Sequence, residues 1–214
     1  WDLPSPTLDD LAARLDDRGL IVPCDISDAE QVAKAVRLSE AELGPIRGCF
    51  ANAGTGGPRR PVLEYETADW QEVLHVNVEG TLITLRAVGR AMVASGQHGA
   101  MVATASLAAR SGAARSAAYG ASKGAVLSLV NAMAVELARH RIRVHALLPG
   151  WIETGMTRAA LVTRQMEERV LTRIPMKRWG QPDDFAGLAV YLMSDASSYQ
   201  TGGSFVVDGG YSLY

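Results

Sequence analysis

The chain has 214 residues, of which 48% are hydrophobic and 21% are charged, a length and composition that predict one globular domain with a sizeable core. A formal net charge of −2 without a basic cluster argues against a nucleic-acid-binding protein. Strictly apolar stretches fall far short of the ~20 residues that a membrane span needs, so we expect none. The two cysteines, Cys24 and Cys49, indicate a reducing compartment, taken to be the cytoplasm, and not a disulfide scaffold.

Strand-like and helix-like segments alternate along the chain. Short apolar runs predict strands at 20–25, 46–51, 100–106, 143–148 and 204–207. Helices are expected at 8–15, from a Ser27–Glu30 capping box to about 42, at 67–95, from Tyr119 to about 140, and at 182–193. Strands that alternate with helices predict an α/β fold with a doubly wound parallel sheet in a single domain, 1–214.

A tyrosine and a lysine stand four residues apart in the segment AYGASK, which begins at Ala118. On a helix, positions i and i+4 share a face, so the side chains of Tyr119 and Lys123 would lie within reach of one another. An ammonium beside a phenol lowers the phenol's pKa from about 10, which suits it to exchange a proton with an alcohol or ketone. The alternative is a coincidental pair on an ordinary helix.

Other polar residues stand where strands end, at the edge at which open α/β sheets bind ligands. Ser106 ends one strand, the turn Asn52-Ala53-Gly54 follows a second, and Pro149 to Thr154 follows a third. Asn77 is an amide within an apolar helix and needs a partner if it is buried. These motifs, in this order, resemble the short-chain dehydrogenase/reductase family, and the resemblance runs from residue 2 to residue 210.

The resemblance implies a Rossmann-like enzyme that interconverts a secondary alcohol and a ketone with NAD(P). It implies that Tyr119 transfers the proton, that Ser106 hydrogen-bonds the substrate oxygen, and that Lys123 lowers the tyrosine pKa and contacts the nicotinamide ribose. Asn77 would complete the proton path through a water molecule. The alternative function is a cofactor-sensing or structural protein of the same fold, without turnover. No spacing of histidine, cysteine or carboxylate residues suggests a metal site.

The resemblance also implies a dinucleotide site. Asp2 would accept hydrogen bonds from both ribose hydroxyls and repel a 2′-phosphate, which favours NAD over NADP; the alternative is a solvated aspartate. Asp25 and Ile26 would border the adenine of the cofactor; the alternative for Asp25 is an aspartate that simply precedes a helix. Asn52 could also brace neighbouring strands. The residues implied in cofactor binding are Asp2, Asp25, Ile26, Asn52, Ala53, Gly54, Tyr119, Lys123, Pro149, Gly150, Ile152 and Thr154.

A glycine-rich phosphate-binding turn, which the family places between a first strand and its helix, does not precede Asp2. In the family's strand order that first strand lies at the sheet centre, between the elements that end at Asp2 and Ala51. We therefore expect residues 1–214 to leave a gap in the sheet. We also expect the native polypeptide to carry roughly 30 to 40 further N-terminal residues.

The segment 150–180 is predicted to be a lid over the substrate. Its sequence does not choose among 3-oxoacyl thioesters, sugars or polyols, steroids and simple secondary alcohols, and its arginines are either solvated or meet an acidic substrate. The helix residues 126–137 are apolar on nearly every side. This pattern, together with the apolar end 211–214, predicts a homotetramer or homodimer.

Overall fold

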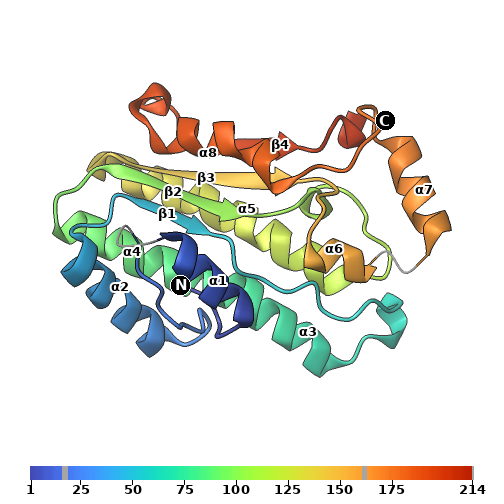
Figure 1. Cartoon of the computed structure of the whole chain (residues 1–214), viewed down its shortest axis with the longest axis horizontal. Coiled ribbons are helices and arrows are strands. Elements are labelled where there is room, and N and C mark those ends of the chain that lie inside the picture. The colour runs from blue at the N-terminus through green and yellow to red at the C-terminus, as the bar shows by residue number, and fades with distance from the viewer. Residues whose placement is uncertain (16–18, 161–162, 214) are drawn as a thin grey trace.

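A computed structural model describes residues 1–15, 19–160 and 163–213. Its sheet has four parallel strands in the order β1-β2-β3-β4 (Figure 1). These strands are β1 (Gly48–Ala51), β2 (Gly99–Thr104), β3 (Ile142–Pro149) and β4 (Ser204–Val207). The predicted parallel α/β architecture is confirmed, and the last strand has the predicted bounds.

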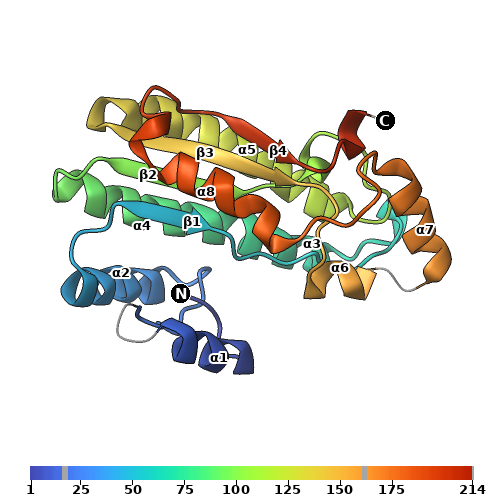
Figure 2. The same ribbon diagram turned by 45° about the horizontal axis from the view of Figure 1, so that its top comes forward.

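Helices cover both faces of the sheet. On one face α4 (Thr81–Ala94) and α5 (Ala117–Leu137) pack against the strands, and on the other lies α8 (Ala186–Met193) (Figure 2). Successive strand residues point to opposite faces, so Met101 is buried in the α4 and α5 layer while its neighbour Val102 is buried against Leu192 of α8. Burial on both faces explains why β2 and β3 read as continuous apolar runs.

The N-terminal part forms a separate small layer. α2 (Ala29–Leu43) packs against α4, and α1 (Pro6–Leu15) lies beyond it (Figure 2). The predicted strand at 20–25 is wrong in extent: Asp2 and Pro23 form a single parallel bridge, in which Asp2 donates its backbone N–H to Val22 and accepts from the backbone N–H of Cys24. The predicted capping box is also wrong. Asp28 caps α2 by accepting from the backbone N–H groups of Glu30 and Gln31, while the Ser27 hydroxyl donates to Asp25.

The predicted helix at 67–95 contains a wider turn in its middle. α3 (Thr67–Leu74) runs into a π-helical turn (His75–Gly80) that continues as α4. The Thr81 hydroxyl donates to the Asn77 carbonyl oxygen at 2.8 Å within this turn. π-helical turns inside α-helices are frequent at functional sites, and this one carries the candidate residue Asn77.

The segment 150–180 leaves the sheet after β3 and holds two short helices, α6 (Gly155–Ala160) and α7 (Arg164–Arg173). A parallel bridge between Ile152 and Gly180 closes its base. A 3₁₀ turn (Pro182–Phe185) then leads into α8, so the predicted helix at 182–193 exists with a tighter first turn.

The stretch Ala117–His140, which is α5 and the 3₁₀ turn after it, is long and apolar enough by length and composition to cross a membrane. This is weak evidence, because core helices of globular proteins share both features. α5 packs along β3 and buries Ser122 and Lys123, two polar side chains that a lipid-facing helix would not hold in this way.

Candidate active site

Tyr119 lies in the first turn of α5, and Ser106 lies just past the end of β2. The Ser106 hydroxyl lies close enough to the Tyr119 phenol to act on its pKa, and the Lys123 ammonium stands 5.7 Å from the centre of the tyrosine ring. Gly120 allows this approach, since a Cβ there would lie 3.2 Å from the carbonyl oxygen of Ala108 in the turn after Ser106. The structure therefore brings the predicted serine, tyrosine and lysine together.

Burial governs the charges of this group. Lys123 is only 4% exposed, its Nζ donates to the Thr104 carbonyl oxygen at 2.7 Å, and burial lowers its pKa to about 8. Burial also raises the pKa of Tyr119, and the nearby Ser106 hydroxyl opposes that rise. The expected lowering of the tyrosine pKa by Lys123 is therefore not found with the protein groups alone, because desolvation of the phenolate outweighs the other effects.

Asn77 is fully buried and satisfied at both ends of its amide. Its Oδ1 accepts from the Thr55 backbone N–H at 2.8 Å, and its Nδ2 donates to the Thr55 carbonyl oxygen and to Ser122 Oγ, each at 2.9 Å. Ser122 in turn donates to the carbonyl oxygen of Tyr119 at 2.7 Å. Asn77 thus ties the loop after β1 to α5. The sequence reading missed Thr55 and Ser122, because nothing local marks partners that lie 22 and 45 residues from Asn77.

The turn Asn52-Ala53-Gly54 lies against the same group. A Cβ at Gly54 would stand 3.0 Å from Asn77 Oδ1 and 3.4 Å from Lys123 Nζ. Glycine at this position therefore lets the backbone approach both side chains closely. The Thr104 hydroxyl donates to Asn52 Oδ1 at 2.8 Å, which confirms that Asn52 braces β1 against β2.

The residues after β3 continue along this edge of the sheet. Gly150 donates its backbone N–H to the Val207 carbonyl oxygen, and a Cβ at Gly150 would lie 2.6 Å from Asp208 Cβ. The Thr157 hydroxyl donates to the carbonyl oxygen of Ile152, a buried residue, and also accepts from the backbone N–H of Thr154. Thr154 is exposed, and its hydroxyl is hydrogen-bonded to Thr157, so both serve the start of α6.

The predicted adenosine-side residues have structural partners of their own. The Asp25 carboxylate accepts from the backbone N–H and the hydroxyl of Ser27 at 2.9 and 2.7 Å, and these bonds lower its pKa. Asp2 is exposed, and its Oδ1 accepts from the backbone N–H of Leu3. Ile26 packs against Gly80 of the π-helical turn.

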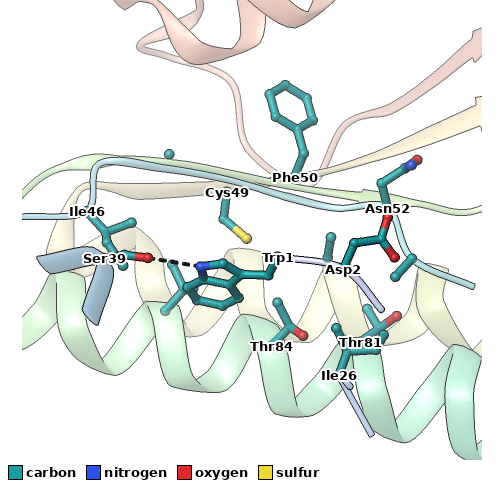
Figure 3. A pocket seen from close by; sticks show the side chains of 14 residues that line it. Trp1, Asp2, Ile26, Ser39, Ile46, Cys49, Phe50, Asn52, Thr81 and Thr84 are labelled. Carbon is teal, nitrogen blue, oxygen red and sulfur yellow. Dashed lines mark hydrogen bonds between the residues drawn. The ribbon is translucent and has the colours of Figure 1, made fainter. Parts of the chain in front are cut away.

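A cavity of about 350 Å³ separates the Trp1–Asp2 segment from β1 (Figure 3). The Trp1 indole donates to Ser39 of α2 across one end of the cavity, the Cys49 thiol points into it, and the Phe50 ring points away. It lies where we expect a gap in the sheet. Four of the predicted cofactor residues line it, namely Asp2, Ile26, Asn52 and Ala53.

Within the part of the chain that the structure describes, no group of three or more histidine, cysteine or carboxylate side chains could hold a metal ion. The thiols of Cys24 and Cys49 are free, and burial raises the pKa of both, that of Cys49 to about 12. Thiols of this kind are poor nucleophiles and poor metal ligands.

Comparison with known proteins places the chain in a family. A family model described as enoyl-(acyl carrier protein) reductase matches residues 2–212. The 2-dehydro-3-deoxy-D-gluconate 5-dehydrogenase of Pseudoalteromonas atlantica is 39% identical over 88% of this chain and 73% of its own length. The galactitol 2-dehydrogenase (L-tagatose-forming) of Cereibacter sphaeroides is 38% identical over 90% of this chain and 76% of its own length.

Solved structures agree with the sequence comparison. The gluconate 5-dehydrogenase of Burkholderia cenocepacia, in complex with NADP and tartrate, superposes with a TM-score of 0.90 and 32% identity, covering 100% of this chain and 85% of its own. The match extends over the sheet, both helical layers and the segment that carries Ser106, Tyr119 and Lys123. The chain belongs to the short-chain dehydrogenase/reductase family.

Proposed function

We propose that this protein is an NAD(P)-dependent oxidoreductase that interconverts a secondary alcohol and a ketone, with Tyr119 as the acid and base. The observation that carries the proposal is the grouping of three predicted side chains: the Ser106 hydroxyl lies near the Tyr119 phenol and opposes the rise of its pKa, and a buried Lys123 ammonium stands 5.7 Å from the same ring. A hydroxyl and a phenol that lie side by side can both reach one substrate oxygen.

The protein groups have separate tasks in this reaction. In the reducing direction the Tyr119 phenol donates a proton to the oxygen of the substrate, and in the oxidising direction its phenolate removes one. Ser106 hydrogen-bonds the same oxygen and stabilises the charge that develops on it. Asn77 and Ser122 hold α5 in register with the loop after β1, because their hydrogen bonds join the two.

The edge of the sheet fits a nicotinamide cofactor at its catalytic end. A Cβ added at Gly54 would lie 3.0 Å from Asn77 Oδ1 and 3.4 Å from Lys123 Nζ, so glycine leaves open the space beside these two side chains. Lys123 would contact the ribose, and the residues 149–154 would line the nicotinamide. When bound there, the cofactor supplies the hydride chemistry.

For the adenosine end we propose NAD over NADP, because the exposed Asp2 carboxylate would repel a 2′-phosphate. The Burkholderia cenocepacia relative was solved with NADP, so the preference needs a direct test. Steady-state kinetics with both cofactors decides it: a higher kcat/KM with NADP(H) contradicts the assignment to Asp2. Asp2→Ala should reduce the difference in kcat/KM between NAD(H) and NADP(H).

For the substrate we propose a sugar acid or polyol. The names of two relatives, a 2-dehydro-3-deoxy-D-gluconate 5-dehydrogenase and a galactitol 2-dehydrogenase, support this class of substrate over acyl thioesters and steroids. The polar surroundings of the site also suit a hydroxylated substrate, since Thr104, Asn52 and Thr154 stand at the same edge of the sheet.

The test is a panel of sugar acids, polyols, simple alcohols and their ketones, assayed with both cofactors for wild type, Tyr119→Phe and Ser106→Ala. We expect Tyr119→Phe to lower kcat by at least about 100-fold while cofactor binding is retained. Tyr199→Phe is the matched control, because that ring is fully exposed. Cofactor binding without turnover of any panel member would instead favour the non-catalytic alternative.

We further propose that the chain assembles as a homodimer or homotetramer. Apolar side chains on the outer faces of α4 and α5 remain exposed, among them Leu82, Val93 and Val135, the last at 80%. Of the predicted C-terminal contact, Tyr211 packs within its own chain and Leu213 is exposed. Light scattering on the purified protein tests this proposal, and Val135→Glu should weaken the assembly.

A further inference from the structure

The turn that follows β4 touches the segment 150–180 at both of its ends. This C-terminal turn comprises residues 208–211. The Asp208 carboxylate accepts from the backbone N–H groups of Gly210 and Ser212 at 2.9 and 2.7 Å, which fixes the shape of the turn. Gly209 and Gly210 both have positive φ angles, 60° and 86°, a conformation that glycine adopts without strain.

The start of the segment contacts this turn through Gly150 and Trp151. A Cβ at Gly150 would lie 2.6 Å from Asp208 Cβ, so the two backbones touch. The Trp151 ring makes edge contacts with two other rings, with centroids 6.4 Å from Tyr211 and 5.9 Å from Trp179. The tyrosine of the turn therefore packs against the first residues of the segment.

The far end of the segment contacts the same turn. The Arg173 guanidinium, at the end of α7, lies over the Tyr211 ring at 4.5 Å from its centroid. The Met176 backbone N–H donates to the Gly209 carbonyl oxygen at 3.2 Å, and Ile174 is only 2% exposed beside Gly209. One aromatic ring thus joins the two ends of a segment that lies between β3 and α8.

We propose that Tyr211 is a positioning residue that latches the segment 150–180 onto the C-terminal turn, with Arg173 and Trp151 as its two partners. The ring contacts Arg173 through its face and Trp151 through an edge pair, both of which are stabilising geometries. Loss of the ring removes one contact from each end at once. The effect on catalysis rests on the proposed oxidoreductase function, whereas the latch itself does not.

Hydrogen exchange measured by mass spectrometry on the full chain tests the latch. The amides of Met176 and Lys177 report it, because Met176 donates to Gly209 and Lys177 to Ile174. We expect Tyr211→Leu and Arg173→Met to speed exchange at the amides of Met176 and Lys177 by roughly 10-fold. Tyr211→Phe keeps the ring and should exchange these amides as slowly as wild type. Arg169→Met, one turn away on α7 and also exposed, is the matched control.

Wild-type exchange at these amides in both Tyr211→Leu and Arg173→Met overturns the proposal. Equal acceleration in Arg169→Met, or acceleration that extends to the amides of β3, would also overturn it, because either shows general loosening. Arg173 is exposed, so its variant reports the latch even if Tyr211→Leu does not fold. In steady-state kinetics we expect Tyr211→Leu and Arg173→Met to raise the KM for substrate with little change in kcat. If Tyr119→Phe keeps full activity, the proposed function fails while the exchange result still decides the latch.

Discussion

Lowering the pH from 7 to 5 tests the burial of His145 in the centre of the sheet. This residue lies on β3, is fully buried, and meets the Phe205 ring edge-on with centroids 5.5 Å apart. Neither ring nitrogen has a hydrogen-bond partner among the described residues. Burial, with the nearby Arg143 guanidinium as a second cause, lowers the pKa of His145 from 6.5 to about 4.

The sign and size of the effect follow from proton linkage. The unfolded chain takes up a proton at this residue below pH 6.5, whereas the folded chain does so only near pH 4. The free energy of unfolding therefore falls as the pH falls from about 6.5 towards 4. At pH 5 the loss from this one residue is about 2 kcal/mol, at 1.36 kcal/mol for each pKa unit.

Urea unfolding at pH 7, 6 and 5 measures this loss. Other groups titrate in the same range, so the informative quantity is the difference between wild type and His145→Leu, which cannot take up the proton. We expect wild type to lose about 2 kcal/mol more than His145→Leu between pH 7 and pH 5. His98→Gln is the control, since His98 is exposed and should follow wild type. Parallel curves for wild type and His145→Leu would refute the reasoning.

Three further substitutions test the site. Gly54→Ala should lower kcat/KM by about 10-fold or more with the fold retained, because the new Cβ would press on Asn77 Oδ1 and Lys123 Nζ; unchanged kinetics would mean that the loop shifts freely. Asn77→Leu should cost about 2–3 kcal/mol in urea unfolding, since Thr55 and Ser122 lose buried partners, whereas Asn131→Leu on the exposed face of α5 should cost little. Lys123→Met should abolish activity yet raise the melting temperature at pH 7. That gain should shrink as the pH rises from 8 to 10.5, because the folded wild type loses its proton at about pH 8 while the unfolded chain keeps it to about 10.5; a constant difference across this range would contradict the burial of a charged lysine.

The sequence predicted the features that depend on local pattern. The apolar runs located β1 to β4 within a few residues, and the i, i+4 spacing placed Tyr119 and Lys123 on one face of α5. The sequence-based prediction failed where the choice between neighbouring residues depended on geometry. Ser27 was predicted to cap α2, but its hydroxyl donates to Asp25, and Asp28 accepts from the N–H groups of the helix. The segment 20–25 has the composition of a strand, but among the described residues it pairs only with Asp2, through one bridge, because composition does not specify how far a pairing extends.

By itself, then, the sequence determined the parallel α/β architecture and supplied the candidate residues for the proposed chemistry, because hydrophobic periodicity and strand ends can be recognised in short stretches of chain. Only the tertiary structure decided their partners and their charge states. The hydrogen bonds of Asn77 to Thr55 and Ser122 join residues far apart in the chain, and the directions of the Tyr119, Lys123 and His145 pKa shifts follow from how deeply the fold buries them. The same holds for the contact of Arg173 and Trp151 with Tyr211, since burial and long-range contacts exist only once the chain has packed.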